Sequence, residues 1–270
     1  MIHPTAVIDP RAHLDAGVEV GPYAVIEAGV VVGPDCRIGP HVHLSGQTTI
    51  GAANLFHTGC VIGNIPQDLK YRGAPSRTRI GDGNSFREHV TVNRATDETE
   101  DTVIGSHNLL MACSHVAHNT RIHDHCIIAN GALLGGHVEV QDRVVISGCC
   151  LVHQFVRIGT FAMMQGGSAI SQDLPPFTMA RGDNSICGLN VVGLRRAGVN
   201  EADRLDLKRL YRFLFRGSLA LQTAVEEARR RFHGPLARTL LDFVAASNRG
   251  VCADVGRERR RRSAGDDSED

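Results

Sequence analysis

Apolar residues recur at every sixth position over the first 170 residues of this 270-residue chain. Of the 29 positions counted in steps of six from Ile2 to Ile170, 26 carry a large apolar side chain. The exceptions are Asp68, Ala74 and Glu98. An amphipathic helix repeats its apolar residues with a period of about 3.6 and a half-buried strand with a period of about 2, so neither explains the pattern. A short fixed period instead indicates a solenoid of stacked repeats.

Small residues mark the corners of this solenoid. Glycine often follows the repeating apolar residue, which predicts a tight turn after each short strand; examples are Gly21, Gly33, Gly39, Gly51, Gly63, Gly81, Gly105 and Gly159. Small or β-branched residues often stand two positions before it, as at Ala6, Cys36 and Thr48. The chain has no Trp, 3 Tyr and 9 Phe, so we expect a narrow interior filled by Ile, Val, Leu and Ala.

Two segments interrupt the repeat, residues 64–79 and 93–103. The pattern resumes in the same phase at Ile80 and Ile104. Each segment is therefore predicted to leave the solenoid as a loop and to return to the same corner. Loops on a rigid scaffold often carry binding residues.

The repeat stops after residue 176, and helical spacing takes over from Asn200, a predicted N-cap. Helices are predicted over residues 201–215, 218–232 and 235–247, the last opened by Pro235. The predicted organisation is a β-solenoid over 1–190 with the two inserted loops, and an α-helical domain over 191–252. Residues 253–270, a basic block followed by an acidic one, are predicted to be a disordered tail.

Composition excludes several classes of protein. The 29 basic and 29 acidic residues give a formal net charge of zero, which argues against a protein that coats nucleic acid. The N-terminal segment does not resemble a secretory signal and no 18 apolar residues run together, so we predict a cytoplasmic protein without a membrane span. Eight cysteines without a CxxC pair indicate free thiols and no disulfide framework: Cys36, Cys60, Cys113, Cys126, Cys149, Cys150, Cys187 and Cys252.

Three of the 14 histidines are expected to share one side of the solenoid. One coil takes 18 residues, so Val116, Leu134 and Val152 should lie above one another, about 4.8 Å apart. His118, His137 and His153 follow these residues by two, three and one positions. The three imidazoles are therefore predicted to stack over three coils. Such a cluster admits two chemistries: a neutral imidazole acting as general base, or three ligands of a catalytic zinc.

Five segments resemble one family within the hexapeptide-repeat acyltransferases, the UDP-N-acetylglucosamine O-acyltransferases that begin lipid A synthesis. They are HVAHNTRI at 115–122, GGHVEV at 135–140, VHQF at 152–155, QDLKY at 67–71 and NVVGLRR at 190–196. The resemblance spans about residues 1–250. It implies an all-β left-handed parallel β-helix followed by a small α-helical C-terminal domain. It also implies transfer of a 3-hydroxyacyl group from acyl carrier protein to the 3-hydroxyl of UDP-GlcNAc, by a homotrimer and without a cofactor.

The resemblance assigns roles residue by residue. His118 matches the general base and Gly136 the backbone N–H that stabilises the oxyanion. Positions that hold the sugar nucleotide match Asp68, His137, His153, Gln154 and Arg196. Positions near the acyl donor match Lys70 and His115, and Gly166 matches the floor of the acyl groove. No metal ligand is implied.

The chain departs from the family pattern at two places. The family usually has Asp directly after the base, and here that residue is Asn119. An amide oxygen can still accept a hydrogen bond but brings no charge, so we expect activity to persist with a pH optimum shifted toward lower pH. The segment 180–190 is about one residue shorter than usual, so nucleotide contacts there are expected to differ.

Acyl carrier proteins are acidic, so the donor site requires local positive charge. A basic cluster surrounds the start of the first long predicted helix and is the candidate docking surface: Arg195, Arg204, Lys208, Arg209 and Arg212. Val31, Leu133 and Leu151 are expected on the outer faces, where association into a trimer would cover them.

Other functions stay open at this point. A zinc hydratase of the gamma carbonic anhydrase type shares the hexapeptide fold, and His118 and His123 have a ligand-like spacing of five. The N-acyltransferase that acts later in the same pathway usually carries an N-terminal domain, whereas the repeat here begins at Ile2. A non-catalytic scaffold would leave the histidine cluster unexplained. The acceptor is UDP-GlcNAc or its 3-amino analogue, and the preferred acyl chain length is not determined.

Overall fold

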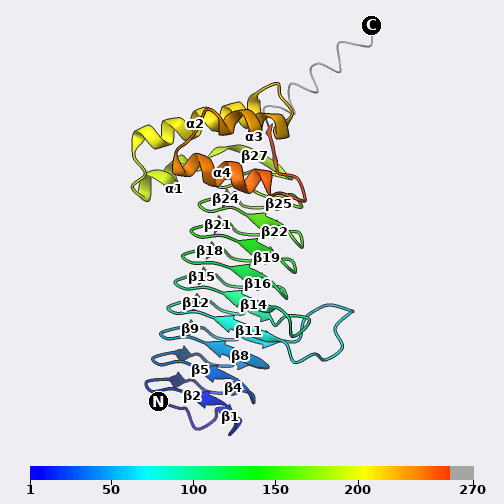
Figure 1. Cartoon of the computed structure of the whole chain (residues 1–270). Helices are drawn as coiled ribbons and strands as arrows, with labels where there is room; N and C mark the ends of the chain where they lie inside the picture. The colour runs from blue at the N-terminus through cyan, green and yellow to red at the C-terminus, as the bar shows by residue number, and fades with distance from the viewer. Residues whose placement is uncertain (256–270) are drawn as a thin grey trace.

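The computed structural model describes residues 1–255, which form a three-sided prism of short parallel strands with helices at its C-terminal end (Figure 1). Each coil contributes one strand to each of three sheets. The prism is the left-handed parallel β-helix that the family resemblance implies. Residues 256–270, the larger part of the predicted tail, lie outside the described residues.

Within residues 1–255, the sheets contain nine, eight and eleven strands. The nine-stranded sheet consists of β1 (Val7–Ile8), β4 (Val25–Ile26), β7 (His43–Leu44), β10 (Val61–Asn64), β13 (Thr91–Asn93), β16 (His115–Val116), β19 (Leu133–Leu134), β22 (Leu151–Val152) and β25 (Ala169–Ile170). The eight-stranded sheet consists of β2 (His13–Leu14), β5 (Val31–Val32), β8 (Gln47–Ile50), β11 (Arg77–Ile80), β14 (Asp101–Ile104), β17 (Arg121–Ile122), β20 (Glu139–Val140) and β23 (Arg157–Ile158). The eleven-stranded sheet consists of β3 (Glu19–Val20), β6 (Arg37–Ile38), β9 (Leu55–Phe56), β12 (Ser85–Phe86), β15 (Leu109–Leu110), β18 (Ile127–Ile128), β21 (Val145–Ile146), β24 (Met163–Met164), β26 (Thr178–Ala180), β27 (Ser185–Leu189) and β28 (Ala253–Asp254).

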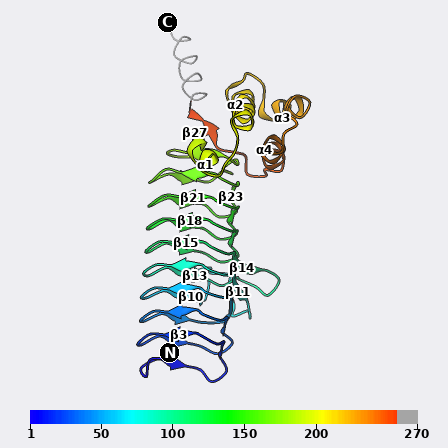
Figure 2. The same cartoon turned by 90° about the vertical axis from the view of Figure 1, so that its left-hand side faces the viewer.

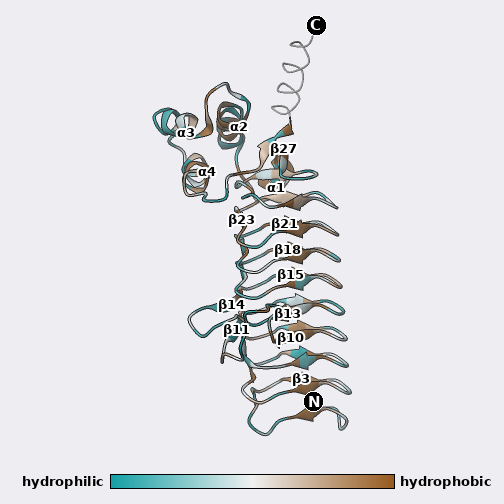
Figure 3. Cartoon of the chain, turned by 90° about the vertical axis from the view of Figure 1, so that its right-hand side faces the viewer, coloured by the Kyte–Doolittle hydropathy of each residue, from teal (hydrophilic) through white to brown (hydrophobic). Residues whose placement is uncertain are grey.

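The six-residue repeat is the inward-facing position of these strands. Val116, Leu134 and Val152 pair in register from coil to coil, as the 18-residue spacing predicts, and all three are buried. Few aromatic rings enter this narrow core; Phe56 and Phe86 stack with their centroids 4.7 Å apart. Figure 3 shows the polar loop beside β11 and β14 against the more apolar strands of the prism.

The glycines after the apolar positions are required for a different reason from the predicted one. Most of them do not have a positive φ. A Cβ at Gly33, for example, would lie 2.8 Å from the carbonyl carbon of Gly51 in the next coil. The left-handed conformation instead occurs two residues later, mostly at residues other than glycine, such as Tyr23 (φ 57°) and Asp35 (φ 56°). Close approach of neighbouring coils therefore explains the small residue at this position.

Inside one corner, buried asparagines form a hydrogen-bonded ladder between coils. The Asn54 Oδ1 accepts from the Asn84 backbone N–H at 3.0 Å, and the Asn84 Oδ1 accepts from the Asn108 N–H at 2.9 Å. The Asn108 Oδ1 then accepts from the Cys126 N–H at 2.7 Å. These side chains satisfy backbone donors that the tight corner leaves without a strand partner.

The two predicted loops exist but are shorter than expected. Residues 77–79 of the first and 101–103 of the second belong to β11 and β14, so the loops span 65–76 and 94–100. Arg77 pairs in register with both Gln47 and Asp101, which extends the strands beyond the two residues of the other coils. Ile80 and Ile104 return to one corner in register, as the phase predicts.

The three predicted helices are present as α2 (Glu201–Arg216), α3 (Leu221–Arg229) and α4 (Pro235–Ala245). The Asn200 side chain caps α2 by accepting from the Asp203 N–H. A further short helix that the sequence reasoning did not predict, α1 (Val191–Arg196), starts at Asn190. Figure 2 shows α2, α3 and α4 beside the C-terminal end of the prism axis. Among residues 1–255, no helix combines the length and apolar character needed to cross a bilayer.

The eleven-stranded sheet continues past the last regular coil. β27 turns back antiparallel to β26, and β28 pairs with β27. Ala253 and Asp254 are therefore part of the sheet and not of a tail. The buried Asp254 carboxylate accepts from the Tyr211 hydroxyl and lies 3.1 Å from Arg216 Nε, which joins β28 to α2.

All eight cysteines are free, as predicted, and five of them are buried. Burial raises the pKa of the Cys60 thiol to about 12, so it stays protonated and unreactive near neutral pH.

Candidate active site

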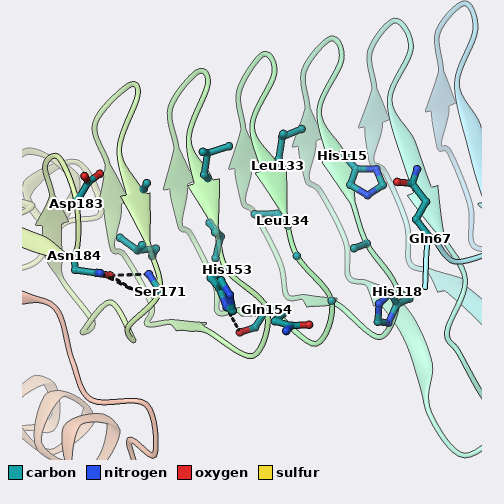
Figure 4. Close-up of a pocket in the computed structure, with 17 residues that line it drawn as sticks. Gln67, His115, His118, Leu133, Leu134, His153, Gln154, Ser171, Asp183 and Asn184 are labelled. Carbon is teal, nitrogen blue, oxygen red and sulfur yellow. Dashed lines mark hydrogen bonds between the residues drawn. The ribbon is translucent and has the colours of Figure 1, made fainter. Parts of the chain in front are cut away.

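A groove of about 740 Å³ runs along the outer face of the nine-stranded sheet and the corner that follows it. Figure 4 shows His115 and Leu133 on the sheet face, with His118, Gln154 and His153 along the corner. The groove crosses strands β16, β19, β22 and β25, and thus four successive coils. It is lined by Gln67, His115, Ala117, His118, Leu133, Leu134, Gly135, Gly136, Leu151, Val152, His153, Gln154, Ala169, Ile170, Ser171, Asp183 and Asn184.

His118 lies at the end of the groove nearest the two inserted loops. Its Nδ1 is 2.9 Å from Asn119 Oδ1, so the amide oxygen occupies the place expected from the sequence. Its Nε2 is 3.9 Å from the Asp68 carboxylate, which the first loop brings to the site. The ring lies against Gly136 in the next coil, where a Cβ would come within 2.5 Å of the His118 Cε1. One ring nitrogen is therefore tied to the protein and the other faces the groove end.

The predicted stack of three histidines is correct for two of its members. His118 and His137 meet edge to face, with ring centroids 5.4 Å apart. The next ring in the column is Phe155, whose centroid lies 4.5 Å from that of His137. Corner residues stack at an interval of 18, so 137 is followed by 155 and not by 153. His153 instead borders the groove, with its Nδ1 3.2 Å from the Gln154 carbonyl.

Two histidines of the site are held toward their neutral form. Burial lowers the pKa of His115, and the nearby His118 lowers it further. The His115 Nδ1 is also 2.7 Å from the Thr91 hydroxyl. Burial and His118 likewise lower the pKa of His137. Crowded imidazoles disfavour one another's positive charge, so neutral rings prevail near pH 7.

The structure brings together most of the site residues expected from the sequence. His115, His118, Gly136, His153 and Gln154 line the groove, and Asp68 and His137 contact His118.

Three other expected residues neither border the groove of the single described chain nor contact His118. Lys70 is exposed on the first loop, and its backbone N–H donates to Asp68 Oδ1. Arg196 is exposed at the end of α1, and Gly166 is exposed in a turn on the opposite side of β25.

Sequence reasoning missed other residues of the groove. Gln67 stands beside Asp68 in a segment that was used for the resemblance without being assigned a role. Ser171, Asp183 and Asn184 come together because the Asn184 Oδ1 accepts from the Ser171 N–H at 2.6 Å. Leu133 and Leu151, expected on a face for association, line the groove while 43% and 49% exposed.

The basic residues near the helices lie on two elements. Arg204, Lys208 and Arg212 are spaced by four on α2 and border a second hollow between α2 and β27. Arg216 continues the same row. Arg209 is exposed on α2 but is not among the lining residues, and Arg195 lies at the end of α1.

The possible zinc pair separates in the fold. His118 lies in the turn before β17 and His123 in the turn after it, so the two occupy different corners. His123 Nε2 is 3.6 Å from the Glu139 carboxylate, and this nearby acid raises the His123 pKa. Within residues 1–255 there is no group of three His, Cys, Asp or Glu side chains that could hold a metal ion.

Comparison with known proteins identifies relatives over almost the whole chain. A family model described as "Udp N-acetylglucosamine O-acyltransferase; Domain 2" matches residues 173–252, and one described as "Bacterial transferase hexapeptide (six repeats)" matches residues 101–136. An acyl-[acyl-carrier-protein]–UDP-N-acetylglucosamine O-acyltransferase from Gloeothece citriformis is 49% identical over 91% of this chain and 90% of its own. The enzyme of the same name from Herminiimonas arsenicoxydans is 42% identical over 93% of this chain and 98% of its own.

Solved structures agree. A UDP-N-acetylglucosamine acyltransferase from Bacteroides fragilis superposes with a TM-score of 0.90 at 36% identity, covering 93% of this chain and 99% of that one. The UDP-N-acetylglucosamine acyltransferase of Arabidopsis superposes with a TM-score of 0.82 at 32% identity, covering 93% and 100%. Sequence, prism and C-terminal helices all match over the same span, and the chain belongs to the family of acyl-[acyl-carrier-protein]–UDP-N-acetylglucosamine O-acyltransferases.

Proposed function

We propose that the protein transfers a 3-hydroxyacyl group from acyl carrier protein to the 3-hydroxyl of UDP-GlcNAc in the cytoplasm, the first step of lipid A biosynthesis. The observation that carries the proposal is the geometry of His118. One ring nitrogen is bound to Asn119, and the other is available at the end of an apolar groove. Family membership gives the donor and acceptor classes that the relatives' names state.

His118 Nε2 acts as the general base. It takes the proton of the sugar 3-hydroxyl while that oxygen attacks the thioester carbonyl. The Asp68 carboxylate, 3.9 Å away, stabilises the imidazolium that forms. Collapse of the tetrahedral intermediate breaks the C–S bond, and the imidazolium returns the proton to the carrier's thiolate.

The Gly136 N–H stabilises the negative oxygen of that intermediate. Among the described residues this N–H donates to no other acceptor, whereas the N–H groups on either side, of Gly135 and His137, are both used within the prism. A free donor beside the base is the requirement for an oxyanion site.

The apolar floor of the groove fits the acyl chain. Leu133, Leu151 and Ala169 stand one above another on the sheet face, leading away from His118. A chain bound there would cover side chains that water now reaches. We assign the sugar nucleotide to Asp68, His137, His153, Gln154 and Arg196, and the acyl donor to Lys70, His115 and Gly166.

The donor protein docks on α2 and α1 in this proposal. The row of Arg204, Lys208 and Arg212 gives an otherwise neutral chain a concentrated positive face. Such a face steers an acidic partner and orients it. Arg195 and Arg209 extend the surface.

A homotrimer completes the proposal. The outer faces of the nine-stranded sheet near the N-terminus carry Val7, which is 63% exposed, and Val25. Exposed apolar residues in one row indicate a surface that association covers. In such a trimer, Arg196 and Gly166, which do not border the groove in one chain, would contribute to a groove shared with a neighbouring chain.

The direct test is transfer from 3-hydroxyacyl carrier proteins of several chain lengths to UDP-GlcNAc, followed by mass spectrometry of the product. We expect product with the wild type and a loss of roughly 10²- to 10⁴-fold in kcat for His118→Ala, the usual contribution of a general base. Phe155→Leu, changed at the far ring of the column, serves as a control and should retain most activity. Equal activity of His118→Ala and wild type would refute the assignment. If product formed only with the 3-amino analogue, that analogue and not UDP-GlcNAc would be the acceptor.

A further inference from the structure

The amide of Asn119 has one orientation only. Its Oδ1 accepts from the Thr96 backbone N–H at 3.1 Å and from the Thr96 hydroxyl at 3.1 Å. A backbone N–H can only donate, so the amide atom facing it must be the oxygen. Asn119 is 7% exposed, so water cannot readily substitute for Thr96.

This orientation fixes the proton on His118. The same Oδ1 lies 2.9 Å from His118 Nδ1 and can only accept, so Nδ1 carries the hydrogen of the neutral ring. The lone pair of the neutral imidazole is then on Nε2, the nitrogen that faces Asp68 and the groove end.

A carboxylate stands directly behind the amide. Asn119 Nδ2 donates to Glu100 Oε2 at 3.3 Å, and the same oxygen is 3.6 Å from His137 Nδ1. Both Thr96 and Glu100 belong to the second inserted loop, residues 94–100. The loop thus hydrogen-bonds to both polar atoms of the Asn119 amide.

We propose that Thr96 and Glu100 are positioning residues of the acyl transfer, and that Glu100 supplies through the Asn119 amide the negative charge that the family usually carries on the residue after the base. Negative charge on Glu100 polarises the amide, strengthens the hydrogen bond to His118 Nδ1 and favours the imidazolium of the reaction. This inference rests on the proposed function, in which His118 is the base.

The other charged or titratable groups around the site are few. Asp68 from the first loop faces His118 Nε2, and His115 on β16 and His137 in the next coil face its ring. The Asp97 carboxylate on the second loop partly opposes the lowering of the His137 pKa. Removing the charge of Glu100 leaves the protonated base less stabilised, so the base stays unprotonated to lower pH. The acidic limb of kcat/KM against pH therefore shifts downward.

Three variants separate the charge from the hydrogen bond. Glu100→Gln keeps an acceptor for Asn119 Nδ2 and should shift the acidic limb by about 0.3 pH unit with little loss of kcat, because Glu100 is 55% exposed and partly screened. Glu100→Ala removes both and should lower kcat about fivefold, a fraction of the roughly 10²- to 10⁴-fold effect of a general base. Glu98→Ala is the matched control, because the Arg77 guanidinium donates to the backbone carbonyl of Glu98, which the substitution keeps.

Rescue distinguishes positioning from a structural role. Asn119→Asp in the Glu100→Ala background returns a carboxylate next to the base and should restore most of kcat while moving the acidic limb above that of the wild type. No recovery, or an equal loss in Glu98→Ala, would overturn the inference. A rise in KM for UDP-GlcNAc at constant kcat would also overturn it, because Glu100 would then act on substrate through His137.

A spectroscopic measurement keeps the inference independent of the assay. In protein labelled with ¹⁵N-histidine, with His118 assigned from the His118→Gln variant, we expect a protonated Nδ1 and an unprotonated Nε2 in the wild type. The same tautomer should persist in Glu100→Ala, because the Thr96 N–H still fixes the amide oxygen of Asn119, but the hydrogen bond at Nδ1 should be weaker. The opposite tautomer in the wild type would refute the inference. The expected tautomer in a protein that transfers no acyl group would refute the proposed function alone.

Discussion

Two site residues at the corners of the prism have unusual backbone conformations. Asn119 and His137 have φ of 57° and 58°, a region that few residues other than glycine adopt. They lie one above the other in successive coils. The Asn119 N–H donates to the Thr102 hydroxyl at 2.8 Å, and the His137 N–H donates to the His118 carbonyl at 3.0 Å. The rigid prism thus supports a local geometry that an isolated loop would not keep.

Gly136→Ala tests how closely the base depends on its neighbour. The added methyl group would overlap the His118 ring, whose Cε1 lies 2.5 Å from the Cβ position, and the ring must move. A displacement of this kind can reduce kcat by about 10²-fold. The φ of Gly136 is not positive, so folding should persist.

Gly148→Ala is the matched control, because its Cβ would meet no atom closer than 3.3 Å. Both variants should show wild-type circular dichroism. Full activity of Gly136→Ala in the transfer assay would mean that the ring position seen here is not the reactive one.

The sequence predicted which coils carry the site but not every contact in it. The 18-residue spacing predicted that His118 and His137 lie together. The third ring, Phe155, was missed because a residue stacks on the one 18 positions later, and His153 is 16 positions after His137. Glu100 and Thr96 were hidden for a different reason. They belong to a segment without periodicity, and only the returning loop brings them to Asn119.

Among the elements, α2 divides into two faces. Leu207, Leu210 and Leu214 are buried, and the row from Arg204 to Arg216 lies beside the hollow next to β27. Arg216 is paired with Asp254, whereas Arg204, Lys208 and Arg212 have no ion-pair partner among residues 1–255. The helix was predicted from this spacing, whereas α1 was not, because six residues are too few for periodicity to be recognised.

Charge reversal at Arg204 and Lys208 tests the docking surface. The double variant to Glu should raise KM for the acyl carrier protein about tenfold or more at low salt, with little change in KM for UDP-GlcNAc, because only the donor is a large acidic partner. Steady-state kinetics with each substrate varied in turn measures the difference.

Arg238→Glu on α4 is a charge-reversal control outside the row, since its side chain donates to the His233 carbonyl and does not border the hollow between α2 and β27. Equal effects of the double variant on both substrates would refute a docking role.

The whole molecule is a column in which each coil bonds mainly to its neighbours. The outer face of the eight-stranded sheet carries polar residues such as Arg79, Arg121 and Glu139, and the nine-stranded sheet carries Val7 and Val25. Val31, expected from the sequence at a covered face, is on the more polar sheet. The apolar sheet is therefore the better candidate for contact between chains.

Light scattering on the purified protein should give the mass of three chains. Val25→Asp should favour smaller species, because a charge would be buried at the contact. His13→Asp on the eight-stranded sheet, at the same end of the prism, should leave the mass unchanged. A fully active monomer would exclude the trimer as a requirement for catalysis.

The return of β27 and β28 has a consequence for growth of the column. A stack of parallel strands ends in an open row of N–H and C=O groups, which another molecule could extend without limit. Here the antiparallel β27 and the short β28, fastened to α2 through Asp254, occupy that row. A chain shortened to residue 250 would lose β28 and uncover the edge of β27, and we expect it to aggregate through that edge, which size-exclusion chromatography would detect.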